Sequence, residues 1–107
     1  MIGVYNQNFV SIPVVEVHAS SMTIDASTGV IHTWSATGNE TINFTGQAGN
    51  RLSLYITCDA IARTITLGTG VSASIVTFLL TSLKTSVMQL EHNGTSFVLA
   101  PAPTTLL

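Results

Sequence analysis

The stretch Arg51-Leu52-Ser53-Leu54-Tyr55-Ile56-Thr57 carries the clearest structural signal in this sequence. Its apolar residues Leu52, Leu54 and Ile56 alternate with polar or amphipathic residues. Successive side chains of a β-strand point to opposite faces, so this alternation predicts a strand with one face in a core and the other toward solvent.

Similar short runs lie on both sides of this segment, with turn residues about every ten positions. They predict strands at 14–18, 22–25, 30–36, 41–45, 63–67, 86–92 and 96–100. The stretch 74–80 is ambiguous, because Ile75, Leu79 and Leu83 also fit helical spacing, but its β-branched residues favour a strand. Asn93-Gly94 between two β-runs predicts a hairpin whose two central residues both have positive φ.

These signals predict a single all-β domain over residues 1–107, built as an antiparallel β-sandwich or jelly-roll-like barrel. We find no internal repeat of the kind that marks a solenoid. The β core is expected at 13–100, with Pro13 placing the first strand at a sheet edge. Residues 1–12 and the Pro-containing stretch 101–107 are expected to form extended terminal arms.

Charged residues are scarce, because only 7% of the chain is Asp, Glu, Lys or Arg. A small soluble monomer usually has about a quarter or more of its surface charged. We therefore expect much of this surface to lie against other protein chains. Three cations without a basic run argue against a nucleic-acid partner, and no apolar stretch is long enough to span a membrane. The lone Cys58 and the lack of a signal peptide predict assembly in a cytoplasm.

The candidate chemical groups do not form a recognisable catalytic or metal-binding motif. His18, His32 and His92 lie in different runs without metal-ligand spacing, so neither a metal nor a cofactor is expected. No Gly-x-Ser-x-Gly motif and no closely spaced carboxylate pair is present, so we expect no catalytic residues and no enzyme activity.

Three larger side chains are candidates for structural or binding roles. Trp34 is expected to anchor the core or an interface, and its alternative role is a platform that stacks on a sugar. Arg51 and Arg63 are expected to pair with Asp59 or Glu91, or to cross a subunit boundary.

A longer pattern extends from the central strand to the end of the predicted core. It comprises a Gly-bounded loop, a strand that begins with Arg, an acidic turn, an Arg-Thr-Ile-Thr strand and a hairpin with Asn-Gly-Thr before an aromatic residue. The segments are Gly46-Gln47-Ala48-Gly49-Asn50-Arg51-Leu52-Ser53-Leu54-Tyr55-Ile56, Asp59, Arg63-Thr64-Ile65-Thr66-Leu67-Gly68 and Met88-Gln89-Leu90-Glu91-His92-Asn93-Gly94-Thr95-Ser96-Phe97. Over residues 41–100 it resembles a β-module common in structural proteins of tailed bacteriophages, including capsid decoration (cement) proteins and tail-fibre domains. Ala60-Ile61-Ala62 differs from the Gly-rich turn that is usual there.

The resemblance implies a trimeric virion protein. The short chain of 107 residues favours a decoration protein on the capsid exterior, a homotrimer that bridges copies of the major capsid protein and stabilises the head. Alternatives are a tail-fibre or spike component that binds a host glycan through exposed Trp34 and Tyr55, and a small hydrolase or lectin-like subunit. Capsid or subunit contacts are expected at Ile2, Val4, Tyr5, Phe9, Trp34, Arg51, Arg63, Leu106 and Leu107.

Overall fold

The protein is described by a computed structural model over residues 12–99 and 103–106. Within these residues it is an all-β fold with a single turn of 3₁₀ helix, η1, at Ala26–Thr28. The strands are β1 (Val14–Val15), β2 (Ser21–Asp25), β3 (Ile31–Ala36), β4 (Glu40–Thr45), β5 (Arg51–Cys58), β6 (Arg63–Leu67), β7 (Val71–Ala73), β8 (Thr77–Leu80), β9 (Thr85–His92), β10 (Phe97–Leu99) and β11 (Thr104–Thr105). The predicted all-β class is therefore confirmed.

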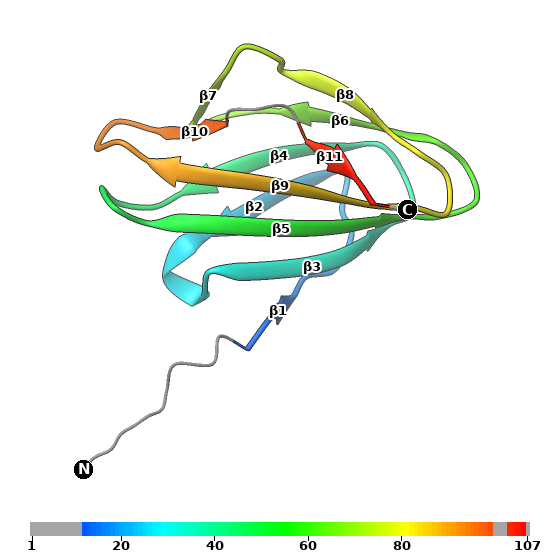
Figure 1. Ribbon diagram of the computed structural model, residues 1–107, viewed down its shortest axis with the longest axis horizontal. Coiled ribbons are helices and arrows are strands. Elements are labelled where there is room, and N and C mark those ends of the chain that lie inside the picture. Colours follow the sequence, from blue (N-terminus) through cyan, green and yellow to red (C-terminus); the bar gives the residue numbers. More distant parts are fainter. Residues whose placement is uncertain (1–11, 100–102, 107) are drawn as a thin grey trace.

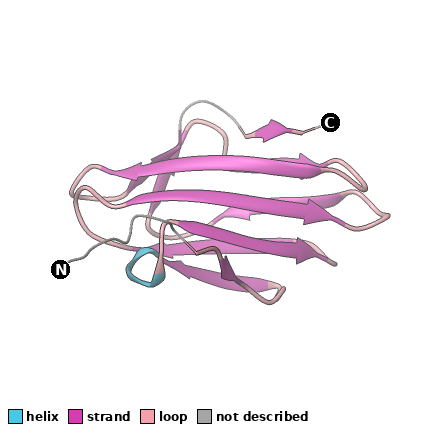
Figure 2. Cartoon of the chain, turned by 60° about the horizontal axis from the view of Figure 1, so that its bottom comes forward, coloured by secondary structure: helices cyan, strands magenta, loops and turns pink. Residues whose placement is uncertain are grey.

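The strands lie in two layers (Figures 1 and 2). The larger sheet has the order β1-β3-β5-β9-β10-β7, with β11 also paired to β9. The smaller sheet has the order β2-β4-β6-β8. In Figure 1 the green β5 and the orange β9 run side by side through the middle of the larger sheet.

The first six strands alternate between the two sheets. Within each sheet they pair in parallel, β1 with β3 and β5, and β2 with β4 and β6. Val14 lies beside His32 and Ile31 beside Ser53, so successive coils advance by about 20 residues. The chain thus winds as a β-solenoid over this part, which corrects the prediction of an antiparallel sandwich or jelly roll without solenoid character.

The remaining strands close the fold mainly in antiparallel pairs. β8 pairs antiparallel with β6, and β9 pairs antiparallel with both β5 and β10. β7 pairs in parallel with β10 at the far edge of the larger sheet. Sequence analysis missed β7 and resolved the ambiguous stretch 74–80 correctly, because its second half forms β8.

The core lies between the two sheets and follows the predicted alternation. Leu52, Leu54 and Ile56 of β5 are buried, as are Ile65 and Leu67 of β6. The inward residues of the neighbouring strands complete it: Met22, Ile24, Trp34, Ala36, Ile42, Phe44, Cys58, Leu80, Met88, Leu90, Phe97 and Leu99. The thiol of Cys58 is buried and donates to the carbonyl oxygen of Ile61 at 3.2 Å.

The hairpin between β9 and β10 is confirmed, but its turn differs from the prediction. The loop spans residues 93–96, and only Gly94 in it has positive φ, at 102°. Asn93 instead holds the turn with its side chain, whose Oδ1 accepts from the backbone N–H groups of Thr95 and Ser96. The side-chain bonds of an Asx turn therefore replace the expected two-residue geometry.

One glycine of the bacteriophage-like pattern has a clear steric role. A Cβ atom at Gly46 would lie 2.6 Å from the ring of Phe97, closer than such atoms approach in proteins. The loop before β5 can therefore pack on the aromatic residue of the hairpin only with glycine at this position.

The ends of the chain differ in part from the predicted arms. Residues 104–106 lie against the larger sheet, with Thr104 beside Val87 and the Leu106 N–H bonded to Thr85. This segment therefore does not leave the fold as predicted, because its backbone finds partners on β9. At the other end, β1 is an edge strand as expected, and the predicted arm lies outside the described residues except for the exposed Ile12.

Candidate functional site

Two arginines form ion pairs within the chain, as the sequence predicted. Nε of Arg51 lies 3.0 Å from a carboxylate oxygen of Glu91, and the two residues face each other across β5 and β9. Arg63 forms a two-pronged pair with Asp59 at 2.9 and 2.7 Å. Hydrogen bonds from Arg63 lower the pKa of Asp59 below its ordinary value, and the same bonds raise the pKa of Arg63. Both arginines are therefore paired with acids of the same chain.

Glu40 at the start of β4 is buried between two hydrogen-bond partners. Its carboxylate accepts from Nε1 of Trp34 at 3.0 and 3.1 Å. Nδ1 of His18 lies 2.5 Å from its Oε2, within hydrogen-bond distance. The three groups satisfy one another in a place where an unpaired charge would be costly.

A second His–Glu pair joins the same two coils. His32 of β3 is fully buried, with Nδ1 at 2.7 Å from Glu16 and Nε2 at 2.9 Å from the carbonyl oxygen of Gly29. Both ring nitrogens face oxygen atoms, and Nε2 donates to the Gly29 carbonyl. His32 is therefore a core residue tied to a carboxylate 16 residues away in the sequence.

The third histidine lies in the hairpin. Nδ1 of His92 accepts from the Gly94 N–H, and its ring packs edge-on against Phe97 with centroids 4.9 Å apart. Among residues 12–99 and 103–106, no three His, Cys, Asp or Glu side chains lie close enough together to hold a metal ion.

In the segment 13–18, which we call the strap, polar side chains point toward the protein and apolar side chains point toward solvent. Its polar residues Glu16 and His18 point inward to their partners, whereas Val15 and Val17 are 76% and 84% exposed. A backbone bond from Glu16 to Thr33 holds the strap along β3. Exposed apolar groups over paired buried polar groups reverse the usual arrangement, so the outer side of the strap is a candidate contact surface.

The outer faces of the two sheets are rich in hydroxyl groups. On the smaller sheet the register places Ser21, Thr41, Thr66 and Thr77 in one row across all four strands. On the larger sheet the hydroxyl groups of Thr57 and Thr85 lie 2.9 Å apart across β5 and β9. These faces are polar without being ionic, so they lose less on partial dehydration than charged faces do.

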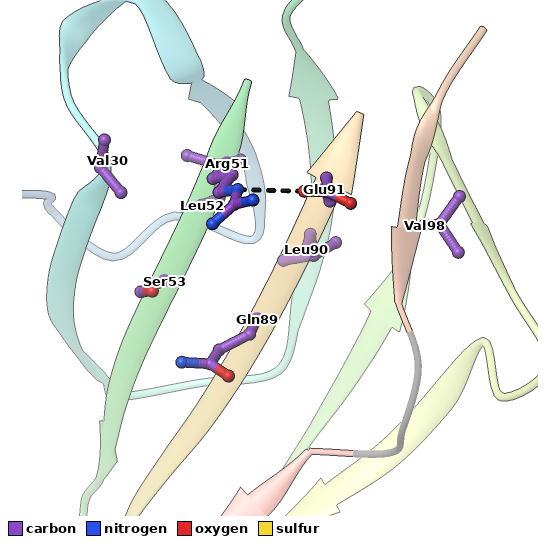
Figure 3. A pocket seen from close by; sticks show the side chains of 8 residues that line it. All are labelled: Val30, Arg51, Leu52, Ser53, Gln89, Leu90, Glu91 and Val98. Atoms are coloured by element: carbon purple, nitrogen blue, oxygen red, sulfur yellow. Dashed lines mark hydrogen bonds and ion pairs between the residues drawn. The ribbon is translucent and has the colours of Figure 1, made fainter. Parts of the chain in front are cut away.

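The surface depressions are shallow. One groove runs over β5 and β9 beside the Arg51–Glu91 pair, and Figure 3 shows its lining side chains. The lining residues are Val30, Arg51, Leu52, Ser53, Gln89, Leu90, Glu91 and Val98. They supply a hydroxyl group at Ser53 but no histidine to act as its base, so this set does not assemble a nucleophile.

The predicted contact residues lie in different environments, and five of them are outside the described residues. Ile2, Val4, Tyr5, Phe9 and Leu107 lie outside the described residues. Trp34 is buried against Glu40 in the core, whereas Leu106 is partly exposed beside β9. The structure does not bring these two residues together with Arg51 and Arg63 in one site, since both arginines pair separately with acids.

Sequence analysis missed the strap as a feature. The alternation in Val14-Val15-Glu16-Val17-His18 predicted a strand but did not indicate which face points inward. The run itself was an available signal, because in a chain with so few charges it holds one of the five acids and one of the three histidines.

No protein-family model matches this sequence, and no curated protein matches it either. No helix among the described residues is long and apolar enough to cross a lipid bilayer.

Proposed function

We propose that this protein is a structural subunit of a bacteriophage virion, a decoration protein that trimerises on the capsid exterior and bridges copies of the major capsid protein. The observation that carries the proposal is a surface on which almost every charged side chain is paired within the chain and several apolar side chains are exposed. The bacteriophage-like pattern of loop, strand and hairpin supplies the virion context.

The charges support this proposal because nearly all of them are used inside the subunit. Of the eight charged side chains, seven make a hydrogen bond or an ion pair with described residues. Lys84 is the exception among the residues that the structure describes. A surface of this kind suits contact with other protein chains better than contact with bulk water.

Exposed apolar side chains support it at three places. Val15 and Val17 lie on the strap, Val76 and Leu79 lie at β8, and Ile61 lies in the turn after β5. Stable interfaces bury on the order of 1,200–2,000 Å² in total, and a trimer presents each patch three times. Three individually weak patches on one rigid particle can thus bind a shell firmly.

The test is sedimentation of the purified protein, followed by binding to capsids that lack it. We expect a trimer that co-sediments with such capsids and raises the temperature at which they release their genome. A stable monomer at micromolar concentration that does not bind capsids would overturn the proposal.

The competing function, a tail-fibre or spike component that binds a glycan, needs an exposed aromatic platform. Trp34 cannot supply one, because its ring is buried and its indole N–H is bonded to Glu40. We therefore do not propose glycan binding through this residue.

A further inference from the structure

The smaller sheet has an open edge at β2. β2 pairs with β4 on one side, and no strand among residues 12–99 and 103–106 pairs with its other side. An open edge strand presents unpaired N–H and C=O groups and is a template for another strand.

This edge has few of the features that normally protect such strands, with a single charged residue, Asp25, at its end. Ser21-Met22-Thr23-Ile24-Asp25 contains no proline and no lysine, and it pairs with β4 over its whole length without a bulge. The first strand of the larger sheet is shorter, with only two residues, and directly follows Pro13. β2 is therefore the better template of the two edges in the first coil.

The direction of the free backbone groups follows from one hydrogen bond. The carbonyl oxygen of Ser20 accepts from the Thr41 N–H, so Ser20 points toward β4. Backbone groups alternate along a strand, so those of Ser21, Thr23 and Asp25 point away from β4. The Asp25 carbonyl already accepts from the Thr28 hydroxyl group, so Ser21 and Thr23 are the main sites without a backbone partner among the described residues.

The residues of β2 are also self-complementary about their centre. In an antiparallel pair of two such strands, Thr23 lies opposite the partner's Thr23, and Met22 lies opposite the partner's Ile24. Ser21 then lies opposite the partner's Asp25, so each carboxylate meets a hydroxyl donor and the two carboxylates lie at opposite ends. Buried residues oppose buried residues and exposed residues oppose exposed ones.

We propose that the β2 edge binds the β2 edge of a second copy of this chain, antiparallel and across a two-fold axis at Thr23. The pairing joins two four-stranded sheets into one. The contact is separate from the three-fold association and the capsid binding proposed above. If trimers form through another surface, it links one trimer to the next.

The test uses charge at the centre of the contact. Thr23→Lys places two ammonium groups opposite each other, and Thr23→Asp places two carboxylates there. Like charges directly opposite destabilise a strand pair, so each variant should weaken the two-fold association about fivefold or more in analytical ultracentrifugation. An equimolar mixture of the two variants should restore it, because opposite charges then meet.

Thr77→Lys is the matched control, since Thr77 is an exposed threonine on β8, at the other edge of the same sheet. It should leave the two-fold association unchanged. Equal weakening by Thr77→Lys, no weakening by Thr23→Lys, or failure of the mixture to restore association would each overturn the proposal.

A cross-linking measurement keeps the test independent of how well the charged variants fold. Thr23→Cys should form a disulfide-linked dimer under mild oxidation, because the two Cα atoms of a directly opposed pair lie about 5.5 Å apart. Ser21→Cys, which faces the partner's Asp25 in this register, should not. Equal cross-linking of both variants, or of neither, would contradict the two-fold register. If Thr23→Cys does not cross-link but the protein still binds capsids, this inference is overturned and the proposed function stands.

Discussion

The middle of the larger sheet and the strap at its edge are stabilised by different kinds of interaction. Leu54 of β5 is fully buried and points inward between the sheets, with apolar neighbours on both sides of the core. In the strap the inward side chains are Glu16 and His18, and the valines face outward. Burial of apolar area stabilises the centre, whereas reciprocal hydrogen bonds stabilise the edge.

The difference concerns specificity as well as stability. An apolar contact tolerates small shifts, because dispersion and burial have little directionality. The Glu40 site accepts only an arrangement in which both Trp34 and His18 reach the carboxylate. Polar pairs therefore fix the register of the first coil, whereas burial of apolar side chains stabilises the central strands.

The largest effect is expected from Leu54→Ala. Removing this fully buried side chain leaves a cavity and should lower the free energy of unfolding by about 2–5 kcal/mol. Urea denaturation measures it. Leu54→Met is the control, because a swap that conserves volume should cost less than about 1.5 kcal/mol. A loss equally small for both variants would show that β5 is not the centre of stability.

Glu40→Leu should have the next largest effect. The apolar replacement leaves the Trp34 N–H without its acceptor, at a cost of about 1–3 kcal/mol. Denaturation followed by Trp34 fluorescence reports both stability and the environment of the indole. Glu40→Gln keeps an acceptor for the indole and should lose less. If Glu40→Leu is as stable as the native chain, reciprocal polar bonding does not hold this edge.

Hydrogen exchange should separate the two regions without any mutation. The Glu16 amide is bonded to Thr33 at the sheet edge, and the Cys58 amide is bonded to Lys84 between central strands. Local opening should expose the former without unfolding the core, so its exchange should be at least about tenfold faster. Equal protection of the two amides would mean that strap and core open as one unit.

The smallest effect is expected for Asp59→Asn, and it depends on pH. The pKa of Asp59 is lowered because Arg63 bonds to its charged form, so the pair stabilises the fold above the ordinary aspartate pKa. This contribution is lost as the pH falls through the lowered pKa. The melting temperatures of the native and variant chains should therefore differ slightly at neutral pH and converge in strong acid. A difference that persists in acid would assign the effect to packing.

The sequence predicted the strands better than their pairing. The alternation of Leu52, Leu54 and Ile56 identified the buried face of β5, and the stretch 63–67 coincides with β6. The parallel winding was not predictable from periodicity, because alternation shows which face of a strand is buried but not which strand lies beside it. The successive coils differ in length and share no repeated motif that would reveal them.

The polar pairs of the edge were hidden for a related reason. Glu16 and His32 are 16 residues apart, and His18 and Glu40 are 22 apart, so only the winding brings them together. Hydropathy alone would turn Val15 and Val17 inward. The arginine pairs were easier to anticipate, because a chain with so few charges offers few possible partners.

The buried thiol of Cys58 provides a reporter for this architecture. It is the only cysteine in the chain, and its sulfur lies under the turn that leads to β6. A thiol-specific reagent can modify Cys58 only in molecules whose core has opened between the two sheets. The labelling rate therefore measures that opening without any mutation. Comparing this rate with and without capsids would test whether the proposed assembly restrains the interior.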